Sequence, residues 1–141
     1  MELLHPIVRD QCLRLQRACR GRGVVLTVTQ TLRSHDEQAA LWAIGRTEPG
    51  NIVTHAPPGY SWHEFGLAFD VAIARFPSDT TPNDLYDGPW QLVGDEGEKV
   101  GLEWAGRWKH PDRPHFENRM FYTLAQLRVL HPHGLGAGEV L

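Results

Sequence analysis

The chain has 141 residues, 41% of them hydrophobic, and five tryptophans, which is typical of a packed globular domain. That length suits one domain, in which we expect residues 131–141 to be a loose tail. Its 14 basic and 17 acidic residues give a formal net charge of −3, too small to suggest a nucleic-acid partner. The N-terminus resembles no signal peptide and no stretch is apolar enough for a membrane span, so we expect cytoplasmic synthesis without membrane insertion.

Four elements are expected in the first half of the chain. Apolar residues at helical spacing predict the first helix, and alternating or β-branched residues predict the strands. Ser34 and Glu37 fit a capping box, which predicts that a second helix begins there. In order, these elements are a helix over 5–20, a strand over 24–31, a helix over 34–45 and a strand over 66–73.

A long loop over 76–89 opens the second half, and its three aspartates match no known calcium loop, so we expect it to be solvated. Helices are then expected over 90–100 and 120–130, with short strands over 102–106 and 114–118 between them. Strands and helices without a regular βαβ alternation indicate an α+β domain, with a small antiparallel sheet flanked by helices.

Three residues are candidate metal ligands. Asp70 lies inside an apolar strand, where an unpaired charge would be costly, so it needs a cation or hydrogen-bond donors. With His63 and His115 it would form the two-imidazole, one-carboxylate set that holds a catalytic zinc with one position open. Spacing alone does not decide between a metal and the alternative, in which backbone amides or an arginine donate hydrogen bonds to the carboxylate of Asp70. Because the segment around Glu64 lacks the second histidine of H-E-x-x-H, that glutamate is not assigned as a base.

Two motifs resemble those of the LAS-type zinc peptidases, a group of D-Ala-D-Ala carboxypeptidases, dipeptidases and L-alanyl-D-glutamate endopeptidases. The likeness is closest to the short endopeptidase branch, which includes phage endolysins, and spans roughly residues 24–120, including the flanking segments 31–47 and 101–108. The motifs are Ser61-x-His63-x-x-Gly66-x-Ala68-x-Asp70 and Asp112-x-x-His115.

This resemblance implies the LAS or hedgehog-like peptidase fold, with a zinc cleft at the sheet. It implies one Zn²⁺ held by His63, Asp70 and His115, with Asp112 as the general base. Arg33 would face the substrate and stabilise a developing oxyanion or bind a stem-peptide carboxylate. The residues expected to contact substrate are Arg33, Gln38, Ser61 and Trp104.

Two neighbours of the second motif are further candidates. Glu117 lies two positions after His115, so in a strand both side chains would project to the same face, and Glu117 could support the ligand. His110 precedes Asp112 closely and either assists proton transfer or is a solvated loop histidine.

The resemblance implies a monomeric, zinc-dependent peptidase that cuts peptidoglycan stem peptides, with the L-Ala–D-Glu bond as the expected target. Without a recognisable signal, such a chain would act as a phage or prophage endolysin that reaches the wall, in the periplasm, after the membrane opens. Two alternatives stay open: a D-Ala-D-Ala carboxypeptidase or dipeptidase of the same fold, and a non-catalytic zinc-binding domain that interacts with the wall. The net negative charge disfavours a nuclease.

Overall fold

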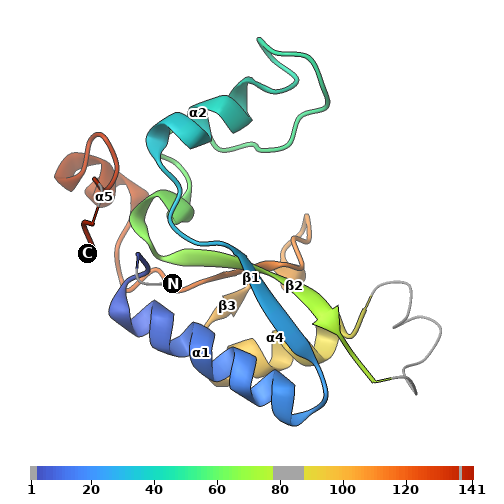
Figure 1. Ribbon diagram of the computed structural model, residues 1–141. Coiled ribbons are helices and arrows are strands. Elements are labelled where there is room, and N and C mark those ends of the chain that lie inside the picture. Colours follow the sequence, from blue (N-terminus) through green and yellow to red (C-terminus); the bar gives the residue numbers. More distant parts are fainter. Residues whose placement is uncertain (1–2, 78–87, 137) are drawn as a thin grey trace.

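A four-stranded antiparallel sheet forms the centre of the molecule, as the computed structural model in Figure 1 shows. Residues 3–77, 88–136 and 138–141 are described, so the three aspartates of the 76–89 loop lie outside the described residues. The strands lie in the order β1-β2-β4-β3, and they are β1 (Val25–Gln30), β2 (Ala68–Arg75), β3 (Glu103–Trp104) and β4 (His115–Glu117). The predicted α+β class and the small antiparallel sheet are therefore confirmed.

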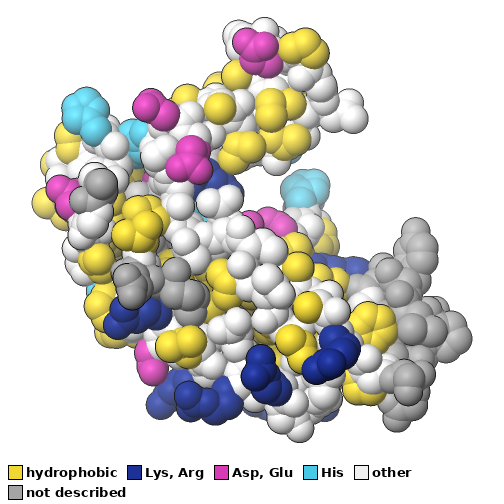
Figure 2. All heavy atoms as spheres, viewed as in Figure 1, with side chains coloured by type: hydrophobic (Ala, Val, Ile, Leu, Met, Phe, Trp, Pro, Cys, Tyr) yellow, Lys and Arg dark blue, Asp and Glu magenta, His cyan; other side chains and the backbone are white. Residues whose placement is uncertain are grey.

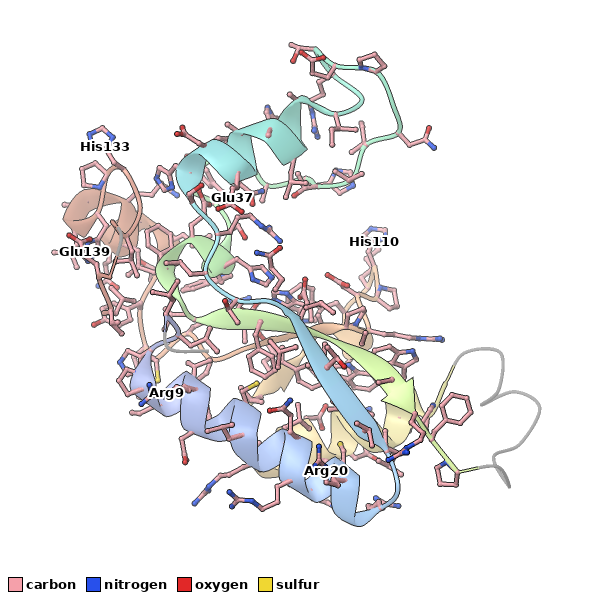
Figure 3. The ribbon with its side chains drawn as sticks, viewed as in Figure 1. Arg9, Arg20, Glu37, His110, His133 and Glu139 are labelled. Atoms are coloured by element: carbon pink, nitrogen blue, oxygen red, sulfur yellow. The ribbon has the colours of Figure 1, made fainter. Side chains whose placement is uncertain are left out.

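Helices α1 (Pro6–Gly21) and α4 (Trp90–Lys99) pack against the same face of this sheet and against each other (Figure 1). The apolar side of α1 is fully buried, whereas Arg9 and Arg20 lie on its outer side (Figure 3). From β2, Phe69 and Val71 enter this core, which leaves Asp70 on the opposite face because side chains alternate along a strand. The sheet therefore separates the hydrophobic core from the face that carries the site.

Helix α4 approaches the sheet closely because it carries two glycines. A Cβ on Gly94 would lie 2.1 Å from the ring of Trp104, and one on Gly97 would lie 2.4 Å from Phe116. We expect Gly94→Ala to lower the free energy of unfolding by about 1–3 kcal/mol, since the ring and helix must move apart. Urea unfolding would measure this. Gly21→Ala is the matched control, because nothing lies within 4 Å of its new methyl group, and an equal loss there would contradict the packing argument.

Helix α2 (His35–Ala43) and the loop that follows it project from the rest of the molecule (Figure 1). The predicted capping box is present, with Ser34 and Glu37 satisfying each other's backbone N–H groups. No residue between 31 and 61 belongs to the hydrophobic core. Figure 2 shows a hollow between this projection and the body, with hydrophobic side chains on the side of the projection that faces it.

The C-terminal third differs from expectation in three places. Helix α5 (Leu124–Leu130) begins at an N-cap Thr123, because Met120 and Phe121 have positive φ angles of 53° and 66° that a helix does not allow. The strand expected over 102–106 is shorter, since a 3₁₀ turn, η2 (Ala105–Arg107), follows Trp104 directly. The tail is not wholly loose, because Leu135 is only 8% exposed.

Within the described part of the chain, no helix has both the length and the apolar character needed to cross a bilayer.

Candidate active site

The antiparallel pairing of β2 and β4 brings the two motifs together. In this register Asp70 lies directly opposite His115, so their side chains share one face of the sheet. His63 comes from a 3₁₀ turn, η1 (Trp62–Phe65), just before β2. Gly66 ends that turn with a φ of 70°, and a Cβ there would lie 2.9 Å from the carbonyl oxygen of Leu3. The motif glycine is therefore required both by its backbone conformation and by the close approach of another segment.

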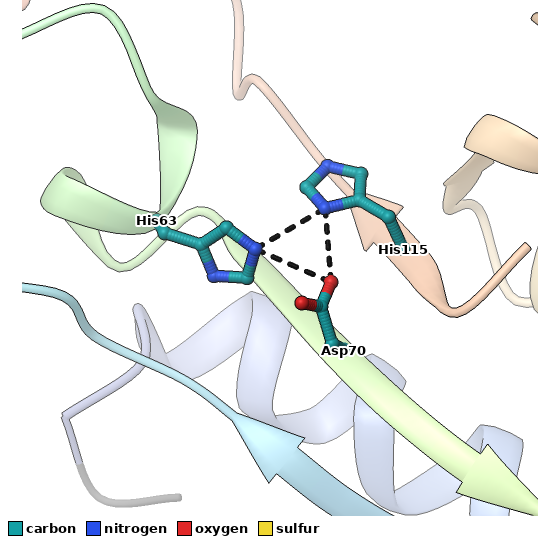
Figure 4. Close-up of side chains that lie close together, drawn as sticks. All are labelled: His63, Asp70 and His115. Atoms are coloured by element: carbon teal, nitrogen blue, oxygen red, sulfur yellow. Dashed lines mark hydrogen bonds and ion pairs between the residues drawn. The ribbon is translucent and has the colours of Figure 1, made fainter. Parts of the chain in front are cut away.

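The three candidate ligands converge, as Figure 4 shows. Nε2 of His63 lies 3.2 Å from Nδ1 of His115 and 3.3 Å from Oδ1 of Asp70. The Nδ1 of His115 lies 3.1 Å from the same Asp70 oxygen. Ligands at about 2.0–2.1 Å from a tetrahedral zinc are separated by roughly 3.3 Å, so this triangle and its donor types fit a zinc ion.

The outer nitrogen of each imidazole is already occupied. Nδ1 of His63 donates to the carbonyl oxygen of Thr31 at 3.0 Å, and Nε2 of His115 donates to Oε1 of Glu117 at 2.9 Å. These bonds leave Nε2 of His63 and Nδ1 of His115 to face the centre of the triangle. Glu117 is fully buried, and its other oxygen accepts from Arg119. Such outer partners orient ligating imidazoles and fix which nitrogen is available.

The hydrogen bonds within the triangle shift the pKa values of Asp70 and His115. Burial alone would raise the pKa of Asp70, but hydrogen bonds with His115 and His63 outweigh it and hold that pKa well below its usual range. Burial alone would lower the pKa of His115, but hydrogen bonds with Asp70 and Glu117 raise it to about 9. The carboxylate is therefore poised to ligate a cation, and a metal would take the place of a proton on His115.

A cavity of about 320 Å³ opens beside the three ligands. Asp112 and Ser61, predicted from the motifs, and Arg33, predicted from the flanking segment 31–47, line it. His110 does not, although it is exposed on the same side of the sheet (Figure 3). The sequence did not indicate that α2 and the following loop supply the rest of the wall. Those unpredicted lining residues are Leu41, Val53 and Thr54.

Asp112 is held by its backbone rather than by its side chain. Its N–H donates to the carbonyl oxygen of Ala105 at 3.0 Å, and its carbonyl oxygen accepts from the N–H of His115 at 3.2 Å. This turn places the carboxylate at the cavity next to the ligands. Partial loss of surrounding water raises the pKa of Asp112, and the nearby charge of Asp70 raises it further, against the opposite effect of His115. A carboxylate of raised pKa is better matched to accepting and returning a proton.

Arg33 reaches the cavity through a buried support. Its backbone N–H donates to the carbonyl oxygen of His63, and one guanidinium NH₂ group donates to Oε1 of Gln38 at 2.8 Å. Gln38 is itself fully buried, and its Nε2 donates to the carbonyl oxygen of Ala56 at 2.7 Å. The expectation that Gln38 contacts substrate is therefore corrected: its amide connects Arg33 to the loop and does not reach the cavity.

We expect Gln38→Met to act through this connection. The substitution keeps the volume but leaves the carbonyl oxygen of Ala56 without its donor, which should lower the free energy of unfolding by about 1–3 kcal/mol. It should also reduce wall hydrolysis, because Arg33 loses its support. Urea unfolding and turbidity assays on purified walls would measure both. Gln91→Met, at an exposed position of α4, is the control, and matching losses there would show that the effect is not specific to Gln38.

The position of Trp104 also corrects an expectation. The residue is 5% exposed, its ring packs against Gly94 and Gly106, and its Nε1 donates to the carbonyl oxygen of Arg113 at 2.8 Å. This burial argues against the predicted contact with substrate. The hydrogen bond from Nε1 to Arg113 instead supports a role in holding the loop before His115. Trp108 is the tryptophan beside the site, with its ring centre 5.5 Å from that of His115.

Glu64 has a structural role that agrees with its exclusion as a base. Its carboxylate is fully buried and accepts from the backbone N–H groups of Gly59 and Ser61, at 2.9–3.0 Å. His35, at the start of α2, lies 2.6 Å from the same carboxylate. This buried group therefore fixes the segment that leads into His63.

Comparison with known proteins gives two sequence matches. A sequence model of the VanY family, described as D-alanyl-D-alanine carboxypeptidase, matches residues 1–105. The peptidoglycan L-alanyl-D-glutamate endopeptidase CwlK of Bacillus subtilis is 38% identical over 121 residues, which cover 81% of this chain and 72% of CwlK.

Solved structures agree with these matches. DacB from Streptococcus pneumoniae D39 has a TM-score of 0.61 at 20% identity, covering 95% of this chain and 74% of DacB. The L-Ala D-Glu endopeptidase ChiX of Serratia marcescens has a TM-score of 0.50 at 26% identity, covering 82% and 80%. A VanY D,D-pentapeptidase in complex with Zn(II) has a TM-score of 0.58 at 14% identity, covering 88% and 77%. Together with the converging motifs, these matches place the chain among the peptidases of the VanY family, within the LAS group that its motifs resemble.

Proposed function

We propose that this chain is a zinc-dependent endopeptidase that hydrolyses the L-Ala–D-Glu bond of peptidoglycan stem peptides. The observation that carries the proposal is the triangle of His63, Asp70 and His115 in one cavity with Asp112 and Arg33. The identity to CwlK supports the bond, and the Zn(II) complex of the VanY neighbour supports the metal.

In this proposal His63, Asp70 and His115 hold one zinc ion. Bound zinc would supply a Lewis acid that polarises a carbonyl group and lowers the pKa of water to about 7. Asp112 takes a proton from the attacking water and passes it to the departing amine. Arg33 and Ser61 line the cavity where substrate would lie, and Arg33 adds fixed positive charge beside the reacting carbonyl or a substrate carboxylate.

The VanY family match favours a second candidate, a D-Ala-D-Ala carboxypeptidase. Digestion of purified muropeptides followed by mass spectrometry separates the two. An endopeptidase releases the stem peptide with D-glutamate at its new N-terminus, and a carboxypeptidase releases free D-alanine. Free D-alanine as the main product would overturn the L-Ala–D-Glu assignment and leave the peptidase class intact.

We propose further that the enzyme is monomeric and acts as a phage or prophage endolysin. Expressed in a bacterial cytoplasm, it should leave cells intact until the inner membrane is permeabilised, after which turbidity should fall. Lysis without permeabilisation would contradict the endolysin role. Light scattering would test the monomer.

A further inference from the structure

A second cavity, of about 290 Å³, adjoins the one that contains the ligands. The two cavities share Arg33 and Leu41 in their linings, so both lie against these two side chains, and together they are called here the groove. The second cavity, called here the α2 subsite, lies along the projecting helix α2. Its lining residues are Gln30, Arg33, Glu37, Ala40, Leu41 and Ile44.

The lining of the α2 subsite combines an apolar wall with one carboxylate. Leu41 and Ile44 present apolar side chains, and Glu37 lies one helical turn before Leu41, on the same side of α2. Figure 3 places Glu37 at the N-terminal end of this helix. One of its oxygens, Oε1, accepts from the N–H of Ser34 at 3.3 Å, which leaves Oε2 for a ligand. These groups fit an alkyl chain that ends in an ammonium group.

Arg33, which lines both cavities, would set the register of a peptide along this groove by binding one of its carboxylates. One NH₂ group is bound to Gln38, and its Nε is buried without a hydrogen-bond partner among the described residues. A guanidinium beside the reaction site suits a carboxylate. In a stem peptide the D-glutamate after the cut is linked through its side chain, so its α-carboxylate is free next to the scissile bond. The next residue, a diamino acid, would then lie beyond Arg33.

We propose that the α2 subsite binds the diamino acid that follows D-glutamate, with its side-chain ammonium on Glu37 and its methylene groups on Leu41 and Ile44. This assignment rests on the proposed function. It makes Glu37 a specificity-determining residue. It also gives a function to α2, which lies beside the ligands although none of its residues belongs to the hydrophobic core.

Synthetic peptides test the assignment. L-Ala-γ-D-Glu-L-Lys should be cleaved with a kcat/KM roughly tenfold above that of the same peptide ending in L-norleucine, which lacks only the ammonium group. Glu37→Gln should abolish this preference while leaving the norleucine peptide unaffected, because glutamine preserves the capping box. Ile44→Ala should lower kcat/KM for both tripeptides but not for the dipeptide L-Ala-γ-D-Glu.

Asp36→Asn is the matched control, since it removes a charge from the same turn at an exposed position that does not line the groove, and it should keep the preference for lysine. Equal wild-type rates on the lysine and norleucine peptides would overturn the subsite. So would an equal loss on both peptides in Glu37→Gln, which would indicate a purely structural role. If the wild-type enzyme releases D-alanine from muropeptides and cleaves none of these peptides, the proposed function fails and the subsite fails with it.

Discussion

Replacing Asp112 with asparagine should abolish wall hydrolysis while the fold and the zinc content stay unchanged. Asparagine has the same shape but cannot take the proton of the attacking water, and loss of a general base typically costs about 10²–10⁴-fold in rate. The backbone bonds of this residue, to Ala105 and His115, do not depend on its side chain. Release of muropeptides from purified walls would give the rate, and atomic spectrometry would give the zinc content.

Asp95→Asn provides the comparison for this variant, because Asp95 is an acidic residue of α4 that does not line the cavity. It should hydrolyse walls at the wild-type rate. Undiminished hydrolysis by Asp112→Asn would rule out the assigned base. A loss of zinc in that variant would point instead to a role for Asp112 in holding the metal.

His115→Ala should lose both zinc and activity. The substitution removes one corner of the ligand triangle and also leaves buried Glu117 without its imidazole partner. Because breaking a buried charged pair costs about 3–5 kcal/mol, we also expect a lower free energy of unfolding. Zinc stoichiometry, wall hydrolysis and urea unfolding would measure the three effects.

Two comparisons make the result specific to the ligand. His110→Ala removes an exposed histidine from the loop that precedes β4 and should keep zinc, activity and stability. The wild-type protein should lose activity on chelation and regain it on addition of one equivalent of zinc. Stoichiometric zinc in His115→Ala, or full activity of the chelated wild type, would contradict the metal assignment.

The sequence predicted the sheet and the convergence of the ligands better than it predicted the details of the wall. An alternating, β-branched run placed β1, and an apolar run placed β2, within two residues of their observed ends, because strands with a buried face are rich in such residues. Gln38 was predicted to contact substrate and its full burial was not foreseen, since a glutamine in a capping region usually faces water. Trp104 was wrongly predicted to contact substrate, because an indole suits a hydrophobic core and a binding cleft equally well. Its packing against Gly94 shows that it belongs to the core.

Boundaries failed where backbone conformation overrides apolar spacing. Met120 and Phe121 continue the helical pattern of α5, yet their positive φ angles exclude them, and the local signal was the pair Thr123 and Gln126. The cavity-lining residues in the loop after α2 could not be predicted, because residues in a loop show no regular apolar spacing.

The pairing of Asp70 with His115 across β2 and β4 has a consequence for how the chain folds. Sliding one strand by a single residue would turn one of these two ligands toward the helices, so only the native alignment can chelate. A cation that binds tightly would therefore select that alignment from competing ones, and zinc supplied during refolding should raise the yield of correctly paired molecules as well as complete the enzyme.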